Sequence, residues 1–328
     1  MKIALVGPGI MSIPPIGWGA VEILIWDYYN VLQKMGHEID IVNIIRQNTW
    51  EQSIPNSNYS FNLINVLNSK DYDFIHIHYD CLFHIMPKLK CNKIAITSHY
   101  PYIDQIGKHA GDGYTNIFHF LVNQQKYYNF VLADKDYKTF LNCGANPFFL
   151  KQMKNGINSS LFHFEQNAIL NKTIYLGKIS PRKKQAIYQQ LENIDFVGNC
   201  EDSNFNIQNK NFLGEWNREK IYKELTNYSN LLLISEGEAD PLVVKEALVS
   251  GLGIVINQNS AANLDIRDFI TIITDDKIND LNYIQQKVND NKLISKNRRE
   301  EIRNYGIMKF SLETIVDKYI EYISDYNN

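Results

Sequence analysis

The feature that most constrains the fold is a repeated change between short apolar runs and longer segments whose apolar residues recur at helical spacing. Segments 20–37 and 217–229 show the helical spacing clearly. This alternation is typical of parallel sheets with helices on both faces, because parallel neighbours need a crossover connection. The expected strands are 2–7, 38–44, 74–78, 93–99, 129–134, 173–177, 194–198, 211–215, 230–236, 253–257 and 271–275.

The series is interrupted once, by the polar segment 154–172, which carries several asparagines and a glycine. Such a segment is a plausible connection between domains, and 328 residues are enough for two hydrophobic cores. We therefore predict an α/β chain of two Rossmann-like domains facing across a cleft. Ligands of such sheets bind beyond the carboxyl ends of the strands, so the cleft is the expected site. Segment 310–326 reads as an amphipathic helix opened by Ser311.

The charge and cysteine content exclude several classes of protein. A net charge of −3 provides no basic field for nucleic acid. The cysteines are far apart without a CxxC pair, which fits reduced thiols. No apolar run approaches the ~20 residues of a membrane-spanning helix, and residues 1–7 read as a strand instead of a signal peptide. We expect a cytoplasmic protein that could still contact a membrane surface. The cysteines are Cys81, Cys91, Cys143 and Cys200.

The first glycine-rich loop, GPGIMSIPPIGWGAVE (7–22), begins like a dinucleotide-binding fingerprint. Two prolines interrupt the point where that fingerprint starts its helix, and Asn43 stands where an acidic residue is needed. A helix starting near Gly19 fits better. Gly17 and Gly19 would then let backbone N–H groups approach an anionic ligand. A tight turn that packs helix on strand is the alternative.

Three polar residues, His76, His78 and Asp80, share one face of a predicted strand and its extension. The two histidines could suggest a metal site, but no further ligand at metal spacing is obvious. Polar residues are also common where strands end. We predict no metal. His99 ends the strand 93–99, where a side chain can meet substrate or serve a structural role.

The segment YLGKISPRKKQ (175–185) leaves a strand, turns at a Ser-Pro pair and presents four cations. Cations at this position could neutralise a diphosphate. A solvated charge run is the alternative. The cations are Lys178, Arg182, Lys183 and Lys184.

The segment SEGEADPLVVKEALVSGLGIVI (235–256) places Glu238 and Glu246 within a run that otherwise reads as buried strand and helix. Asp240-Pro241 is a suitable helix start, with Asp as N-cap and Pro at the first helical position. Gly251 is the expected end of that helix.

Taken in order, six motifs resemble those of the family-4 retaining glycosyltransferases of the GT-B fold. They extend from the first glycine loop to the helix that carries Glu246, and the resemblance runs to the C-terminal helix. The motifs are Gly17-Trp18-Gly19-Ala20-Val21-Glu22, Asp73-Phe74-Ile75-His76-Ile77-His78, His99, Asn155-Gly156-Ile157-Asn158 with Phe162, Gly177 to Lys184, and Glu238 to Ala247.

The resemblance implies transfer of a sugar from a UDP- or GDP-type donor to a glycan, lipid-linked or polysaccharide acceptor, with no cofactor or metal. It also implies that the tail helix crosses back, so that 309–328 completes an acceptor-side domain 1–158 beside a donor-binding domain 159–308. The implied roles are Glu246 on the donor ribose, Glu238 on the transferred sugar, Lys178 and Lys183 on the diphosphate, Gly17 and Gly19 lining it, His99 beside the sugar, and Leu242 and Val243 as further donor contacts.

Three departures from the family pattern bear on the donor. Lys178 replaces an arginine, Lys184 replaces a glycine, and Asp240-Pro241 replaces an aromatic-glycine pair. Pro241 has no N–H to offer a sugar, and Asp240 would add a carboxylate near the donor. A nucleotide-sugar epimerase or hydrolase of the same fold, or a non-catalytic nucleotide-binding relative, are the alternative functions.

Overall fold

The computed structural model describes residues 1–43, 57–59 and 62–327, which divide into two compact units. Residue 44 of the expected strand 38–44 and residue 328 of the expected tail segment lie outside these residues. The sequence-based division fell after residues 158 and 308. The first unit consists of Met1–Pro15, Gly19–Asn155 and Leu312–Asn328, and the second of Ile16–Trp18 and Gly156–Ser311.

The first unit is built on a seven-stranded sheet in the order β3-β2-β1-β4-β5-β6-β7. Every neighbouring pair is parallel, as the alternation of strands and helices predicts. The strands β3 and β7 were not predicted. The strands are β1 (Lys2–Val6), β2 (Glu38–Asn43), β3 (Ser57–Tyr59), β4 (Phe74–Ile77), β5 (Ile94–Thr97), β6 (Tyr128–Val131) and β7 (Leu150–Gln152).

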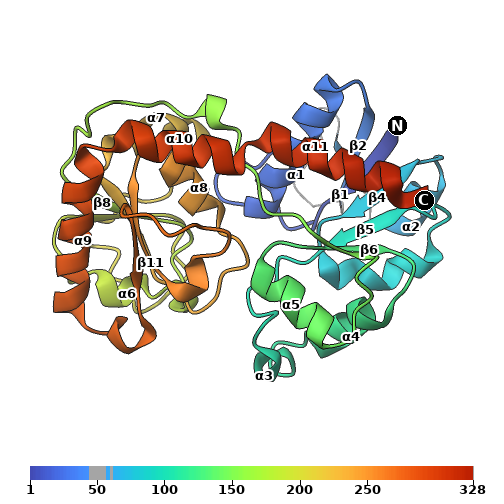
Figure 1. The fold of residues 1–328 in the computed structure, drawn as a ribbon, viewed down its shortest axis with the longest axis horizontal. Coiled ribbons are helices and arrows are strands. Elements are labelled where there is room, and N and C mark those ends of the chain that lie inside the picture. Colours follow the sequence, from blue (N-terminus) through green and yellow to red (C-terminus); the bar gives the residue numbers. More distant parts are fainter. Residues whose placement is uncertain (44–56, 60–61, 328) are drawn as a thin grey trace. The chain divides into compact units, whose positions relative to one another are not determined.

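Helices cover both faces of this sheet, and each face has its own hydrophobic cluster. The last helix, α11, packs beside α1 (Figure 1) and buries Val316 and Tyr319 in the same cluster as Phe74 and Phe130. The chain therefore returns to the first unit at its C-terminal end, as predicted. The helices are α1 (Ala20–Lys34), α2 (Leu63–Asn68), η2 (Asp80–Lys88), α3 (Ile106–His109), α4 (Thr115–Asn123), α5 (Asp134–Asn142) and α11 (Leu312–Ser324).

The second unit contains a five-stranded sheet in the order β12-β11-β10-β8-β9, again entirely parallel. Its central strands are fully buried because helices cover both faces. The strands are β8 (Thr173–Leu176), β9 (Ile194–Val197), β10 (Asn230–Leu233), β11 (Gly253–Asn257) and β12 (Ile270–Ile273). The main helices are α6 (Gln185–Tyr188), α7 (Arg218–Glu224), α8 (Leu242–Val249), α9 (Leu281–Lys296) and α10 (Arg299–Phe310).

The expected strand 211–215 is wrong. Only Phe212 makes a bridge, to Phe196 of β9. Asn209 forms a turn with the backbone that follows it, since its side-chain oxygen accepts the Asn211 N–H at 2.9 Å and its carbonyl accepts the Phe212 N–H at 2.8 Å. The segment still makes backbone bonds to β9, from the Phe196 N–H to the Asn211 carbonyl at 2.8 Å and from the Leu213 N–H to the Phe196 carbonyl at 2.9 Å, but the turn at Asn209 leaves the pairing too short for a regular strand.

Two helices end just before a glycine, as predicted. Gly36 follows α1 with φ 84°, and Gly251 follows α8 with φ 80°. Both values lie in the left-handed region that glycine adopts without a steric penalty. At Gly251 a side chain would also collide with the Phe164 ring, because a Cβ there would lie 2.7 Å from it.

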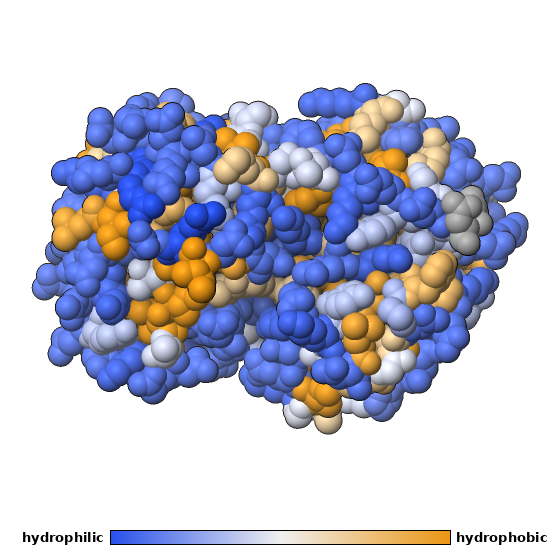
Figure 2. Space-filling view, viewed as in Figure 1, coloured by the Kyte–Doolittle hydropathy of each residue, from blue (hydrophilic) through white to orange (hydrophobic). Residues whose placement is uncertain are grey.

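The face seen in Figure 2 is mainly hydrophilic, with separate apolar patches on each unit. Across the described ranges, no helix combines the length and the apolar character needed to span a bilayer.

Candidate functional site

The basic loop leaves the carboxyl end of β8 and turns through the short helix η4 (Pro181–Lys183). Buried Tyr175 of β8 holds this loop to the end of β10, because its hydroxyl donates to the Lys183 carbonyl at 2.5 Å and contacts the Ile234 carbonyl at 3.0 Å. A backbone bond from the Glu236 N–H to the Arg182 carbonyl, at 3.0 Å, adds a second link. The loops after β8 and β10 therefore form one structure at the carboxyl edge of the sheet.

Glu238 lies buried in this structure between two cations. Its Oε1 lies 3.1 Å from Nη1 of Arg182 and 3.2 Å from Nζ of Lys183. Burial alone would raise the pKa of Glu238, but Lys183 and Arg182 outweigh that effect and hold the pKa below its ordinary value. Arg182 also donates to the Gly237 carbonyl, which fixes the loop around the carboxylate. Glu238 is thus a buried, ionised and oriented acceptor.

Lys178 occupies a different part of the same loop. Its ammonium is 2.6 Å from Glu201 and 4.6 Å from the centre of the Trp18 ring. Trp18 and Gly17 belong to the second unit, and the Trp18 N–H donates to Glu215 at 3.3 Å. A side chain at Gly17 would collide with that glutamate. Lys178 and Lys183 therefore share a loop but have different carboxylate partners.

The start of α8 differs from the predicted capping. Leu242 is the first helical residue, and Pro241 stands at the N-cap with φ −67° and ψ 120°. Asp240 therefore lies one residue before the N-cap, and its carboxylate accepts from Nζ of Lys245 at 2.5 Å in a pair that is almost completely buried. The prediction that Asp240 caps α8 is therefore wrong. The N–H groups of Leu242 and Val243, in the first turn, have no acceptor within an α-helix and suit an anion.

Glu246 lies in the middle of α8 and is 4% exposed. Its Oε1 accepts from Nη2 of Arg218 at 2.7 Å. Burial opposes the charge of Arg218, but the Glu246 carboxylate beside it holds the arginine pKa above its ordinary value. Sequence reasoning missed Arg218, because nothing in the linear order connects the first residue of α7 with the middle of α8.

His99 and Gly19 belong to the first unit. Gly19 is the N-cap of α1 with φ 132°, where a Cβ would lie 3.0 Å from Glu22 and 3.1 Å from Met11. His99 follows β5 and is partly exposed, while its Nε2 is buried. Burial lowers the pKa of His99 to about 4, so the ring is neutral at pH 7.

The two histidines of the expected strand 74–78, His76 and His78, are buried beside His99. His76 contacts Thr97 through Nε2 at 2.8 Å, and burial lowers its pKa to about 3. The His78 ring lies 3.7 Å from that of His76 and 6.4 Å from that of His99. These rings line a cavity of about 10 Å³. Within the described part of the chain, no group of three or more His, Cys, Asp or Glu is arranged to hold a metal ion.

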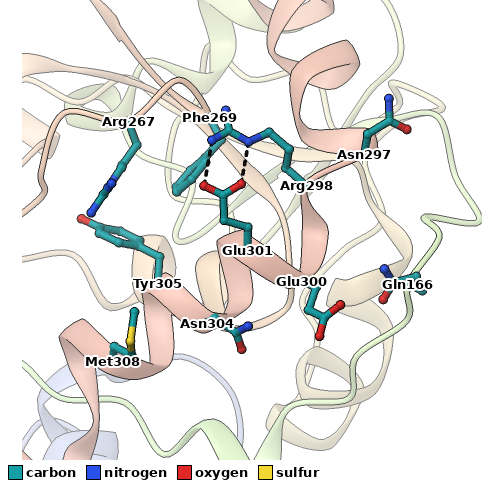
Figure 3. A pocket seen from close by; sticks show the side chains of 10 residues that line it. All are labelled: Gln166, Arg267, Phe269, Asn297, Arg298, Glu300, Glu301, Asn304, Tyr305 and Met308. Carbon is teal, nitrogen blue, oxygen red and sulfur yellow. Dashed lines mark hydrogen bonds and ion pairs between the residues drawn. The ribbon is translucent and has the colours of Figure 1, made fainter.

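A larger cavity, of about 530 Å³, opens beside the amino edge of β12, α10 and the two residues that precede α10 (Figure 3). A bidentate pair between Arg298 and Glu301 crosses it, with both N–O distances at 2.7 Å. The cavity shares no residue with the basic loop, the Glu238 loop or α8. Since ligands of parallel sheets bind at the carboxyl edge, we place the candidate site at the basic loop instead. The lining residues are Gln166, Arg267, Phe269, Asn297, Arg298, Glu300, Glu301, Asn304, Tyr305 and Met308.

Comparison with known proteins gives matches in structure alone. No family model matches the chain, and no curated protein sequence matches it. Sucrose-phosphate synthase from Thermosynechococcus elongatus is similar with a TM-score of 0.77 at 14% identity, over 99% of this chain and 98% of that one. HepE from Anabaena, in complex with UDP-glucose, has a TM-score of 0.74 at 14% identity, over 99% and 100%.

A third similar structure is WaaG, a glycosyltransferase involved in lipopolysaccharide biosynthesis. Its TM-score is 0.70 at 13% identity, over 98% of this chain and 99% of that one. The similarity to all three proteins extends over both parallel sheets of this chain. At these identities the comparisons establish the fold: the chain has the α/β GT-B fold of its glycosyltransferase neighbours, as the motifs led us to expect.

Proposed function

We propose that this protein transfers a sugar, with retention, from a nucleotide diphosphate donor of UDP or GDP type to a glycan, lipid-linked or polysaccharide acceptor. The observation that carries the proposal is the buried Glu238 carboxylate between Arg182 and Lys183, at the carboxyl edge of a parallel sheet. The fold neighbours support it, because HepE was solved with UDP-glucose and also with UDP and glucose.

In this proposal the diphosphate binds at the basic loop. An ammonium group has three N–H donors, and Lys183 uses one on Glu238, so two remain for phosphate oxygens. Lys178 exchanges its exposed partner Glu201 for a phosphate oxygen. The N–H groups at the start of α8, from Leu242 and Val243, supply further donors.

The reaction breaks the bond between the anomeric carbon and the phosphate oxygen, and forms a bond from that carbon to an acceptor hydroxyl oxygen on the same face. Negative charge builds on the leaving diphosphate as the first bond breaks. Fixed donors aimed at that charge contribute about 3 kcal/mol each, by analogy with oxyanion holes. The acceptor proton passes to the leaving phosphate oxygen, so the chain itself need not provide a nucleophile.

The remaining site residues bind the two sugars of the donor. Glu238 accepts hydrogen bonds from hydroxyls of the transferred sugar, and Glu246 from those of the ribose. His99 contributes a neutral ring beside the transferred sugar, because burial keeps its pKa near 4. Gly17 and Gly19 line the diphosphate. Since lysines supply the positive charge, we expect turnover to persist in EDTA.

The test is to incubate the protein with UDP- and GDP-sugars, with and without saccharide or lipid-linked acceptors. Nucleotide release that depends on acceptor, with product of unchanged anomeric configuration by NMR, supports the proposal. Interconversion of donors without release would identify an epimerase. Release without acceptor would identify a hydrolase, and binding without turnover would identify a non-catalytic relative.

A further inference from the structure

The buried pair of Arg218 and Glu246 joins two helices of the second unit. Arg218 is the first residue of α7, and Glu246 lies one turn into α8. Their side chains are 13% and 5% exposed, and Nη2 lies 2.7 Å from Oε1. Burying a carboxylate is costly unless a cation or hydrogen-bond donors pair with it. Arg218 provides that cation, and no other hydrogen bond to this carboxylate is found among the described residues.

Arg218 is itself held in place by its own helix. Its Nε donates to the Tyr222 hydroxyl at 3.3 Å, and its guanidinium carbon lies 4.7 Å from the centre of the Tyr222 ring. Tyr222 in turn packs edge-on against buried Phe162, with ring centres 4.9 Å apart. The guanidinium therefore has a fixed orientation, and its contact with Glu246 orients the carboxylate.

The contact uses one oxygen of the carboxylate. A carboxylate has two oxygens with about four acceptor positions. With Oε1 engaged by Arg218, Oε2 keeps a defined direction in which to accept hydrogen bonds. Without the arginine, Glu246 would rotate among its side-chain conformers, and the fixed acceptor would be lost.

We propose that Arg218 is the positioning residue that fixes the Glu246 carboxylate for the vicinal hydroxyls of the donor ribose. This inference rests on the proposed function, since it assumes that a nucleotide occupies the site. Arg218 thereby sets the preference for a ribose over a sugar that lacks those hydroxyls, without itself taking part in the transfer.

The experiment compares the affinities of UDP and GDP with those of their 2′,3′-dideoxy counterparts by calorimetry. We expect the unaltered protein to prefer the ribonucleotide by about 10- to 100-fold, the strength of hydrogen bonds to a charged group. In Arg218→Met the preference should fall below about threefold. Arg218→Lys keeps a cation but loses the planar fork, so its preference should be intermediate. Because Arg218→Lys leaves the carboxylate paired, it remains informative if Arg218→Met fails to fold.

The matched control is Lys223→Met, which removes an exposed cation from the same helix and should keep the full preference. A merely structural role for Arg218 would weaken binding of ribo- and dideoxynucleotides equally, and that result would overturn the inference while leaving the proposed function intact. Failure of the unaltered protein to bind either ribonucleotide would overturn both.

Discussion

Replacing Lys245 with methionine leaves the Asp240 carboxylate buried without its cation, and we expect a large loss of stability in the second unit. The two side chains are 2% and 0% exposed, and the ammonium lies 4.9 Å from the centre of the Phe310 ring. Burial lowers the pKa of Lys245, and Asp240 opposes that shift. The charge of Lys245 is therefore stabilised by Asp240.

The expected cost follows from this burial. Removing one partner of a buried ion pair costs about 3–5 kcal/mol, because the other charge stays buried and loses its attraction to the opposite charge. Replacing both partners with apolar residues is often neutral or stabilising. The variant Asp240→Leu/Lys245→Met should therefore recover most of the stability that Lys245→Met loses.

The assay is urea unfolding followed by amide hydrogen exchange in peptides from β10 and α8, which reports the second unit by itself. With a slope of about 2 kcal/mol per molar urea, the expected loss lowers the midpoint by about 1.5–2.5 M. Lys296→Met, which removes an exposed lysine from α9, is the control and should change little. A loss below about 1 kcal/mol in Lys245→Met, or a double variant no more stable than the single one, would show that the buried pair does not stabilise the second unit in this way.

Two further predictions concern backbone strain and pH. Lys184 has φ 55°, so Lys184→Gly should raise the free energy of unfolding by about 0.5–1 kcal/mol, whereas Lys184→Ala should give no gain. The pKa of His76 is about 3 in the folded chain against 6.5 ordinarily, so the unfolded chain takes up the proton first as pH falls. The contribution of buried, neutral His76 to the free energy of unfolding is complete above about pH 6.5. About 2 kcal/mol of that contribution is lost between pH 7 and pH 5. Urea unfolding of His76→Gln should show a correspondingly smaller loss over that range, and exposed His119→Gln should behave like the unaltered protein; equal losses in all three would contradict the assignment.

Sequence periodicity predicted most of the sheets because buried parallel strands read as uninterrupted apolar runs. Strand β7 was missed because Leu150–Gln152 has one buried residue and two polar neighbours, which is not a strand pattern. The segment 211–215 pairs with β9 only around Phe212, because a turn at Asn209, which lies outside the apolar run, shortens the pairing. Helix ends marked by Gly36 and Gly251 were predictable, since each needs a left-handed φ that glycine tolerates.

The candidate site was predictable where its residues belong to contiguous motifs, as with Lys183 and Glu238. Their pairing was not, because it depends on how the loops after β8 and β10 pack together. The same limit applies to Arg218, whose partner Glu246 lies on another helix. Asp240 was misread because the adjacent proline suggests a helix cap, while the deciding contact comes from Lys245, five residues later and inside the core.

In the proposed function, the basic loop and α8 of the second unit bind the nucleotide diphosphate of a sugar donor. Calorimetric titration of UDP and GDP into the unaltered protein and Lys183→Ala tests it most directly, with exposed Lys210→Ala as control. We expect one of the two nucleotides to bind the unaltered protein and Lys210→Ala equally well, and to bind Lys183→Ala at least about tenfold more weakly. Undiminished binding by Lys183→Ala, or no binding of either nucleotide to the unaltered protein, would contradict it.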